Sequence, residues 1–272
     1  MKNPLRCDRR LLVAVGFTLL HSNLAFADGV NAEPPEADES GFNILSNATN
    51  VTRWGLGGGL AVGQTPYKGY GIKTSPIPLI SFDDKWVHAL GTTVDVKVGT
   101  WDHLSVALRG QFEIGDGYTG ADAPILTGMH NRKGAFWYGP ALSWNTQFGT
   151  LSGDFLLGGN KGQQANIDFS KSFSLGAFSV TPHAGVEWLS DKYVNYYYGV
   201  MPSEAEVGRP AYTGQHAYDE SIGTRVDYRL TSHQSVQLDF TAKHLRGGIT
   251  DSPLVGKRYL PELRIGYLYR FN

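Results

Sequence analysis

The sequence predicts an all-β protein: an antiparallel transmembrane β-barrel of about 10–12 strands that follows a cleaved signal peptide. Three observations support this fold class. Apolar and polar residues alternate with a period of two along many segments, these segments are about 9–13 residues long, and short turns alternate with longer connections. A tilted strand that crosses a bilayer needs about that length, whereas strands of soluble proteins usually have about 5–6 residues.

The N-terminal segment has the features of a secretory signal peptide. Lys2, Arg6, Arg9 and Arg10 precede an apolar stretch at 11–20, and Ala-Phe-Ala at 25–27 fits the cleavage pattern. Residues 28–49 begin with an acidic run that contains two prolines, which is typical of a disordered leader. We therefore divide the chain into a signal peptide at 1–27, a mostly disordered periplasmic leader at 28–49 and a barrel at 50–272.

Removal of the signal changes the charge and the cysteine count. The only cysteine is Cys7, so the mature chain can form no disulfide and no cysteine metal site. The whole chain has a net charge of −1 and residues 1–27 carry +3, which leaves −4 for the remainder. This balance gives no support to nucleic-acid binding.

Charged residues lie along the polar side of several alternating segments. At 104–114, Arg109 and Glu113 oppose an apolar face, and Asp168, Asp239 and Lys243 occupy the same kind of position further on. A soluble sandwich would also alternate, but full charges along the polar face suit the lumen of a barrel. The strands are expected at 53–62, 76–82, 86–98, 103–114, 134–146, 150–157, 164–175, 178–189, 216–230, 234–243 and 262–271.

The last strand supports the membrane alternative. Residues 262–272 read ELRIGYLYRFN, with Tyr267, Tyr269 and Phe271 on the apolar face, and Asn272 follows the final aromatic residue. This pattern is similar to the insertion signal of bacterial outer-membrane barrels, so we expect Phe271 to end in the periplasm. Eleven strands cannot close a barrel of even number. A segment at 42–48 would make twelve, or loss of 76–82 would leave ten.

Candidate chemistry in the sequence is sparse. The glycines between Gly55 and Gly63 are followed by a Thr-Pro-Tyr turn, not by the helix that a phosphate-binding loop needs. His183 has Ser179 and Glu187 four residues away on either side, about 13 Å along a strand and too far for a triad. We predict no catalytic residue, metal ligand or cofactor site, although partners on neighbouring strands remain possible.

A family resemblance rests on several spaced elements. Residues 193–212, YVNYYYGVMPSEAEVGRPAY, resemble the signature of the MipA/OmpV family of outer-membrane proteins. The segments at 65–69, 126–132, 181–185 and 251–255 resemble further family elements in the same order. The residues that carry the central match are Tyr197, Tyr198, Gly199, Val200, Glu204, Ala205 and Tyr212.

The resemblance implies a function as well as a fold. The family takes its name from interaction with a membrane-bound lytic transglycosylase, and the role inferred for that member is a scaffold that also joins a penicillin-binding protein during murein growth. We therefore expect a non-enzymatic scaffold or interaction protein in the outer membrane of a Gram-negative bacterium, in contact with outer-membrane lipid. The alternative is a narrow porin-like channel for small solutes, with Arg109, Glu113, Asp168, Asp239 and Lys243 facing its lumen.

The tyrosine cluster at 193–198 is the most conspicuous local feature. We expect it to open the longest outer loop, with the rings of Tyr193, Tyr196, Tyr197 and Tyr198 at the depth of the lipid headgroups. Gly199 would then let the chain turn, and Glu204 would face water or pair within the loop. This loop, which includes Tyr212, is expected to be a structural element first and a partner contact second.

Overall fold

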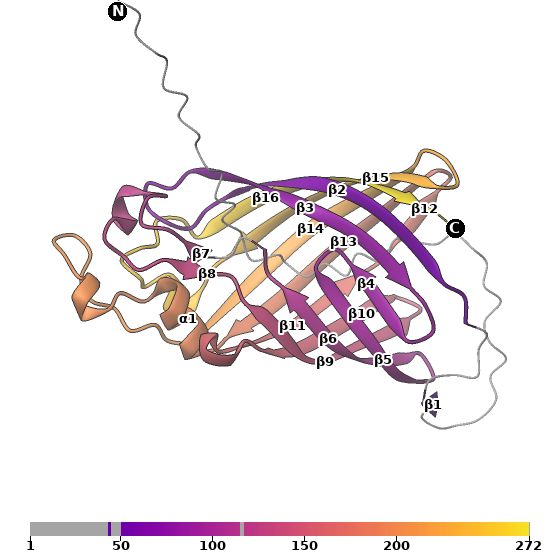
Figure 1. Ribbon diagram of the computed structural model, residues 1–272, viewed down its shortest axis with the longest axis horizontal. Coiled ribbons are helices and arrows are strands. Elements are labelled where there is room, and N and C mark those ends of the chain that lie inside the picture. Colours follow the sequence, from indigo (N-terminus) through magenta and orange to yellow (C-terminus); the bar gives the residue numbers. More distant parts are fainter. Residues whose placement is uncertain (1–42, 45–49, 115–116, 272) are drawn as a thin grey trace, which may run out of the picture.

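The computed structural model describes residues 43–44, 50–114 and 117–271, and the predicted signal peptide lies outside them (Figure 1). Twelve antiparallel strands close a barrel, because β6, at one end of the strand order, also pairs with β5, which follows the short β1 at the other end. The strands of the wall are β2 (Arg53–Gln64), β3 (Ile72–Asp83), β4 (Val87–Leu90), β5 (Thr93–Trp101), β6 (Leu104–Phe112), β9 (Phe136–Thr146), β10 (Gly149–Leu157), β11 (Gln163–Ser170), β13 (Phe178–Leu189), β14 (Ala217–Arg229), β15 (Gln234–His244) and β16 (Tyr259–Arg270).

The twelfth strand is not the one that the sequence suggested. The predicted single strand at 86–98 is two strands, β4 and β5, joined at Gly91, whose φ of 61° allows the tight reversal. In the described part of 42–48, only β1 (Asn43–Ile44) is present, and it pairs with the end of β5. The prediction at 42–48 was therefore wrong as a wall strand, because alternation continues across a two-residue turn and hides the hairpin.

The distribution of side chains is inverted relative to a soluble protein. Large apolar side chains such as Leu108, Ile167, Ile222 and Phe240 are exposed on the outside of the wall. The buried side chains of the same strands are largely polar or charged, including Arg225, Asp239 and Lys243. This arrangement matches a barrel with a lipid-facing surface and a polar interior. Among the described residues, no helix has both the length and the hydrophobicity needed to cross a bilayer.

The connections differ in length at the two ends of the barrel. Turns at 84–86, 102–103, 147–148, 176–177 and 230–233 join strands at one end, which we call the turn end. Loops at 65–71, 113–135, 158–162, 190–216 and 245–258 join them at the other, the loop end. Short turns face the periplasm in outer-membrane barrels, so the loop end faces outward. The C-terminus lies at the turn end (Figure 1).

The loops contain their own short elements. These are β7 (Gly117–Tyr118), η1 (Pro124–Leu126), β8 (Arg132–Lys133), η2 (Gly159–Lys161), α1 (Asp191–Tyr198), η3 (Pro202–Glu204) and η4 (Gly247–Ile249). The loop end also contains the buried apolar core of the molecule, to which Tyr118, Leu126, Trp137, Tyr193 and Leu254 belong. In the wall, the predicted strand at 164–175 is interrupted at 171–172, and β12 (Phe173–Leu175) continues it against β13.

The glycine-rich run of β2 lies in the wall, where it allows a close approach to β16. A Cβ atom added at Gly57 would overlap the carbonyl oxygen of Tyr267, and one at Gly59 would overlap that of Ile265. The neighbouring backbone thus leaves no room for a side chain. The glycines therefore serve strand packing, as expected for a strand in which another backbone approaches closely.

Candidate functional site: an outer plug and a lumen cavity

Helix α1 is the part of the tyrosine cluster that the sequence reasoning missed. The Ser190 hydroxyl caps its N-terminus by accepting a hydrogen bond from the Tyr193 N–H at 3.4 Å. Tyr193, Val194, Tyr197 and Tyr198 are buried on one side of the helix. The spacing of these residues, one, three and four apart, together with Ser190 as a possible N-cap, was the available sequence signal for a helix. The signal was weak because an eight-residue helix has only about two turns, too few to show a helical period.

The tyrosines do not lie at the lipid headgroups. The rings of Tyr193 and Tyr197 have centroids 4.8 Å apart inside the loop-end core, and Tyr193 also packs against Trp137 at 5.6 Å. Tyr67 brings the first loop into the same cluster, since its ring lies 5.8 Å from that of Tyr198. The expected aromatic girdle at 193–198 was therefore wrong. The rings instead fill the outer mouth of the barrel.

Glu204 holds two loops together at the centre of this core. Its carboxylate accepts hydrogen bonds from the Arg132 guanidinium at 3.0 and 3.1 Å and from the His130 N–H at 2.9 Å. It also accepts one from the Met201 N–H at 3.0 Å, and it lies 2.8 Å from Nδ1 of His130. Its side chain is 1% exposed. The expectation that Glu204 faces water was wrong. Glu204 does pair within its own loop, through Met201, but its charged partner Arg132 comes from loop 113–135.

The environment of Glu204 fixes its protonation state. Burial alone would raise the pKa of this carboxyl group, but the hydrogen bonds from His130 and Met201 and the positive charge of Arg132 outweigh burial and lower the pKa to about 2. Glu204 is therefore ionised at neutral pH. Its charge is matched by the buried Arg132, so the pair is a compensated internal contact.

Arg209 forms a second link between the same loops. Its guanidinium donates to the carbonyl oxygens of Glu204 at 2.8 and 3.1 Å, Ile125 at 2.5 Å and Thr127 at 2.9 Å. It also pairs with Glu206 at 3.2 Å, but the carboxylate of Glu206 is 52% exposed. The planar fork of arginine suits this set of carbonyl acceptors, and it fixes loop 190–216 against loop 113–135.

Gly199 and Tyr212 have packing roles in the loops. Gly199 has φ −73° and ψ 154°, which is extended backbone, so the expected turn is absent. Glycine is needed there because a Cβ atom would overlap the Asn195 carbonyl oxygen. The Tyr212 hydroxyl donates to the Gly248 carbonyl, which attaches loop 245–258. Burial, and then the charge of Asp251, raises the pKa of Tyr212.

Segments that are distant in the sequence meet here. Tyr67 donates to the Tyr197 carbonyl at 3.3 Å, Arg132 donates to the Tyr196 carbonyl at 2.8 Å, and Ser252 donates to the Tyr198 carbonyl at 2.6 Å. Three loops thus attach to the backbone of one short helix. We call the buried core at the loop end, with these contacts, the loop plug.

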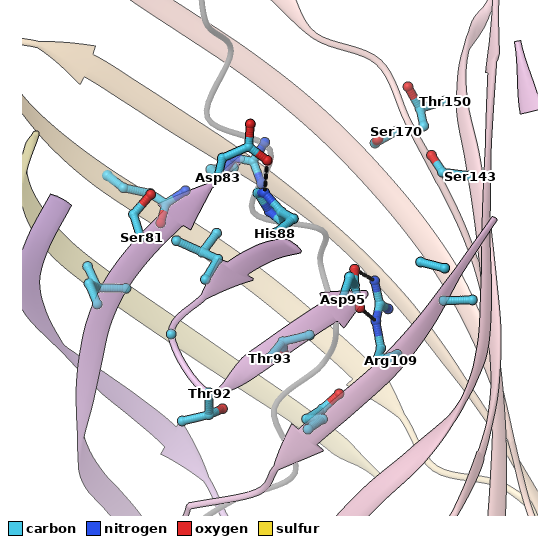
Figure 2. Close-up of a pocket in the computed structure, with 18 of the residues that line it drawn as sticks. Ser81, Asp83, His88, Thr92, Thr93, Asp95, Arg109, Ser143, Thr150 and Ser170 are labelled. Carbon is cyan, nitrogen blue, oxygen red and sulfur yellow. Dashed lines mark hydrogen bonds and ion pairs between the residues drawn. The ribbon is translucent and has the colours of Figure 1, made fainter. Parts of the chain in front are cut away.

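Below the loop plug, the barrel encloses a cavity of about 1100 Å³ that reaches the turn end. Figure 2 shows part of its lining, with Asp83 beside His88 and Asp95 beside Arg109. Its lining includes residues of the turns and strand ends, such as Lys85, Gln147 and Arg270. Among the residues that the structure describes, eight basic and five acidic side chains belong to the lining. The lining therefore carries an excess of positive charge, and the cavity faces the periplasm.

A network of charged side chains runs from strand to strand along the inner face of the wall. Arg109 binds both carboxylate oxygens of Asp95 at 2.8 Å and also Asp154 at 2.8 Å. Asn166 extends the network, with its amide 2.8 Å from Asp154. This network spans β5, β6, β10 and β11, and the bidentate geometry makes it specific as well as strong.

The other sequence-predicted lumen residues lie in separate contacts. Lys243 is 2.6 Å from Glu187, and Asp239 is 3.3 Å from His183. Glu113 lies just beyond the end of β6, where the Gln164 amide is 3.4 Å from its carboxylate. The structure thus does not bring Arg109, Glu113, Asp168, Asp239 and Lys243 together at one point. They are distributed around the wall.

His183 and Asp239 are two of the three members that a hydrolytic triad would need. No serine hydroxyl forms a hydrogen bond with His183 among the described residues, and no group of three or more metal-ligating side chains was found within the same part of the chain. The pair instead lines the interior beside Gly223, whose added Cβ would lie 2.6 Å from Nε2 of His183.

The C-terminal aromatic residues lie on the outer surface at the turn end. Phe271 stacks on Trp54 with ring centroids 4.0 Å apart, and Tyr269 contacts Phe271 at 5.1 Å. Tyr267, two residues earlier, is exposed on the same face. The pairing of β16 with β2 places the last strand beside the first long strand, so this region closes the barrel.

These features define an outer-membrane β-barrel with a plugged outer mouth. The model of the family described as MltA-interacting protein MipA matches residues 56–271, and the chain belongs to this family. It is 28% identical over 229 residues to the MltA-interacting protein of Escherichia coli, a match that covers 80% of this chain and 90% of that protein. It is also 28% identical over 144 residues to outer membrane protein OmpV of Vibrio cholerae, which covers 52% of this chain and 56% of that protein.

A distant likeness to solved structures is also present. The COG4313 outer membrane channel from Pseudomonas putida has a TM-score of 0.42 and 12% identity, with 87% of this chain and all of that chain covered. The membrane location of the present chain rests on its family and on the polarity of its wall.

Proposed function

We propose that this barrel is a non-enzymatic scaffold or interaction protein that contacts a lytic transglycosylase at the periplasmic face of the outer membrane. The observation that carries this proposal is the similarity to a relative named for interaction with MltA, which extends over 80% of the chain. Such a contact would link the barrel to murein synthesis and turnover. A penicillin-binding protein is the proposed second partner of the same assembly.

The turn end is the surface that a periplasmic enzyme can reach. The turns there have two to four residues, so they form a low rim around the mouth of the cavity, without an extended docking platform. The proposed contact is accordingly small and would include the mouth itself. The loop plug lies at the opposite end, and we propose that it stabilises the barrel without contacting murein enzymes.

Photocrosslinking in living cells tests this proposal. A photoreactive amino acid at Gln147, in a turn at the rim, is expected to crosslink to a lytic transglycosylase. The same amino acid at Val207, a fully exposed residue of loop 190–216, is the control and should give no such product. Absence of any murein enzyme from the products at Gln147 and at the other turns would reject the scaffold.

A second candidate is a channel that conducts only when the loop plug opens. The cavity of about 1100 Å³ and its excess of basic side chains favour this alternative, with small anions as the solutes. In planar bilayers the unaltered protein should show rare openings, because the loop plug covers the outer mouth. A variant with a weakened plug should open more often and prefer chloride to potassium. If neither protein conducts, the channel is excluded.

A further inference from the structure

The wall of the barrel is incomplete beside β3. All twelve residues of β3 pair with β2, but only Ser81, Phe82 and Asp83 pair with β4 on the other side. The β4–β5 hairpin turns back at Gly91, whose N–H donates to the Ile80 carbonyl at 2.9 Å. Beyond this point, no strand of the described chain pairs with β3 on that side. Figure 1 shows the short hairpin ending partway along β3.

The sequence of this edge is suited to remaining unpaired. The Ile80 carbonyl points toward β4, so the even-numbered residues of β3 direct their backbone polar groups to the open side. Pro76 and Pro78 are two of these residues, and proline has no N–H group to donate. Prolines in sheets are confined to such edges. A partner strand would therefore find acceptors but no donors at these two positions, which disfavours strand addition.

The gap lies at the depth of the membrane. Ile80 on β3, Phe112 at the end of β6 and Phe136 at the start of β9 are exposed apolar residues near its borders. The Phe112 N–H donates to Thr92 at the tip of the hairpin at 3.0 Å, which places the end of β6 at the level of the tip. Non-helical backbone without partners is tolerated at this depth where it lines a water-filled cavity.

The cavity inside the barrel extends to this gap. Its lining includes Ser75, Pro76, Ile77, Pro78 and Leu79 on one side of the gap, Gly91, Thr92 and Thr93 at the hairpin tip, and Gln111 and Ile114 on the other side. The edge is mainly apolar. Charged residues of the same lining lie deeper in the lumen. The first of them on β6 is Arg109, two residues before Gln111.

Gln111 provides a polar group at the transition. Its side chain is 1% exposed, and neither its amide nitrogen nor its amide oxygen has a hydrogen-bond partner within the described residues. A buried polar group without a partner is costly, so such positions call for a ligand or an ordered water. An apolar edge followed by an unpartnered amide and a basic lumen suits a molecule with an apolar chain and an anionic head.

We propose that the gap between β3 and β6, bounded by the β4–β5 hairpin, is a lateral portal between the membrane and the periplasm-facing cavity. Its ligand is a single-chain amphiphile with an anionic head group, such as a fatty acid. The chain lies along the Pro76–Leu79 edge, and the head group bonds to Gln111 within the basic lumen. This portal does not depend on the scaffold role, and it does not require the loop plug to open.

Site-specific fluorescence tests whether the portal is open. The chain without residues 1–27 has no cysteine, so single cysteines can be labelled with bimane in the full barrel. Ile77→Cys labels a lumen-facing residue at the portal, and Gln237→Cys labels a lumen-facing residue that lines the same cavity on a complete part of the wall. Leu238→Cys is the lipid-facing reference.

Lipid access is measured in phosphatidylcholine vesicles that carry a doxyl group on the acyl chain. The label of the Ile77→Cys variant should be quenched about as strongly as that of Leu238→Cys, while the label of Gln237→Cys stays bright. Equal brightness of the labels at positions 77 and 237 would show a sealed wall and overturn the portal.

Binding is tested with doxyl-stearic acid as the quencher of the label at position 77. Quenching should saturate, and Gln111→Leu should raise the half-saturating concentration about 3–10-fold, the effect of one lost hydrogen bond. Gln164→Leu is the matched control, because Gln164 is equally buried but is not part of the cavity lining. Quenching without saturation, as simple partition into the bilayer gives, or equal shifts in the two variants, would overturn the proposed ligand site.

Discussion

Replacement of Glu204 by glutamine isolates the central charge of the loop plug. The Glu204→Gln side chain keeps its size and one acceptor oxygen. It loses the negative charge to which the Arg132 guanidinium donates two hydrogen bonds. The new NH₂ group also faces the N–H donor of either His130 or Met201, because these two donors bond to different oxygens of the carboxylate. The variant therefore leaves a buried guanidinium partly uncompensated at the junction of loops 113–135 and 190–216.

The expected cost follows from two independent considerations. A pKa lowered from 4.5 to about 2 corresponds to a stabilisation of about 3 kcal/mol of the ionised form in the folded protein. Removal of one partner of a buried ion pair costs about 3–5 kcal/mol. We expect a loss of about 3 kcal/mol in the free energy that keeps the loop plug closed. This loss raises the population of the open plug about 100-fold.

Hydrogen exchange of α1 measures this opening directly. The backbone amides of Glu204→Gln in α1 (Asp191–Tyr198) should exchange about 100-fold faster, while those of the wall strands remain unchanged. Glu206→Gln is the control, since its ion pair with Arg209 is half-exposed and is worth about 0–1 kcal/mol. If both variants exchange at the same rate, Glu204 does not hold the loop plug and the reasoning is refuted.

Three further predictions concern pH, strand closure and assembly. The pKa of Glu204 is lowered by folding, so its contribution is complete above about pH 4.5 and is lost as the pH falls toward about 2; exchange of α1 should rise only in that window, and a rise near pH 6 would contradict it. Gly57→Ala should weaken the pairing of β2 with β16 and lower the temperature of heat-induced mobility change in gels, because its Cβ would overlap the Tyr267 carbonyl; Gly58→Ala, with 3.8 Å to the nearest atom, should have little effect, and equal effects would show that contact is not limiting. Phe271→Ala removes the terminal aromatic residue and its stacking on Trp54, which is worth about 0.5–1.5 kcal/mol, and should reduce the folded fraction in the membrane. Phe178→Ala, which breaks a similar stack with Tyr228, should leave assembly intact; equal losses would mean that Phe271 acts only by stacking.

The wall could be predicted from the sequence because period-two alternation is a local property. Each residue of a strand faces either lipid or lumen, so Leu108 and Arg109 reveal opposite faces without knowledge of their partners. The same locality explains the main error. The alternation runs through Gly91 without a break, so the β4–β5 hairpin looked like one strand, and 42–48 was expected to supply the missing one.

The loop plug could not be predicted from local sequence patterns. Glu204 and Arg132 are 72 residues apart, and nothing in either segment alone specifies the pairing. The tyrosines at 193–198 fit an interfacial girdle by composition, but they are buried because loop 65–71 and loop 245–258 attach to the helix that carries them. Burial in a loop core depends on contacts among four segments, and composition does not encode these contacts.

The sequence by itself determined the class of this protein: an exported all-β chain whose charged residues lie on one face of strands long enough to cross a membrane. The tertiary structure decided which end is closed, where the cavity opens and where the wall is incomplete. These depend on strand register and on long-range loop contacts, and a local pattern carries information on neither.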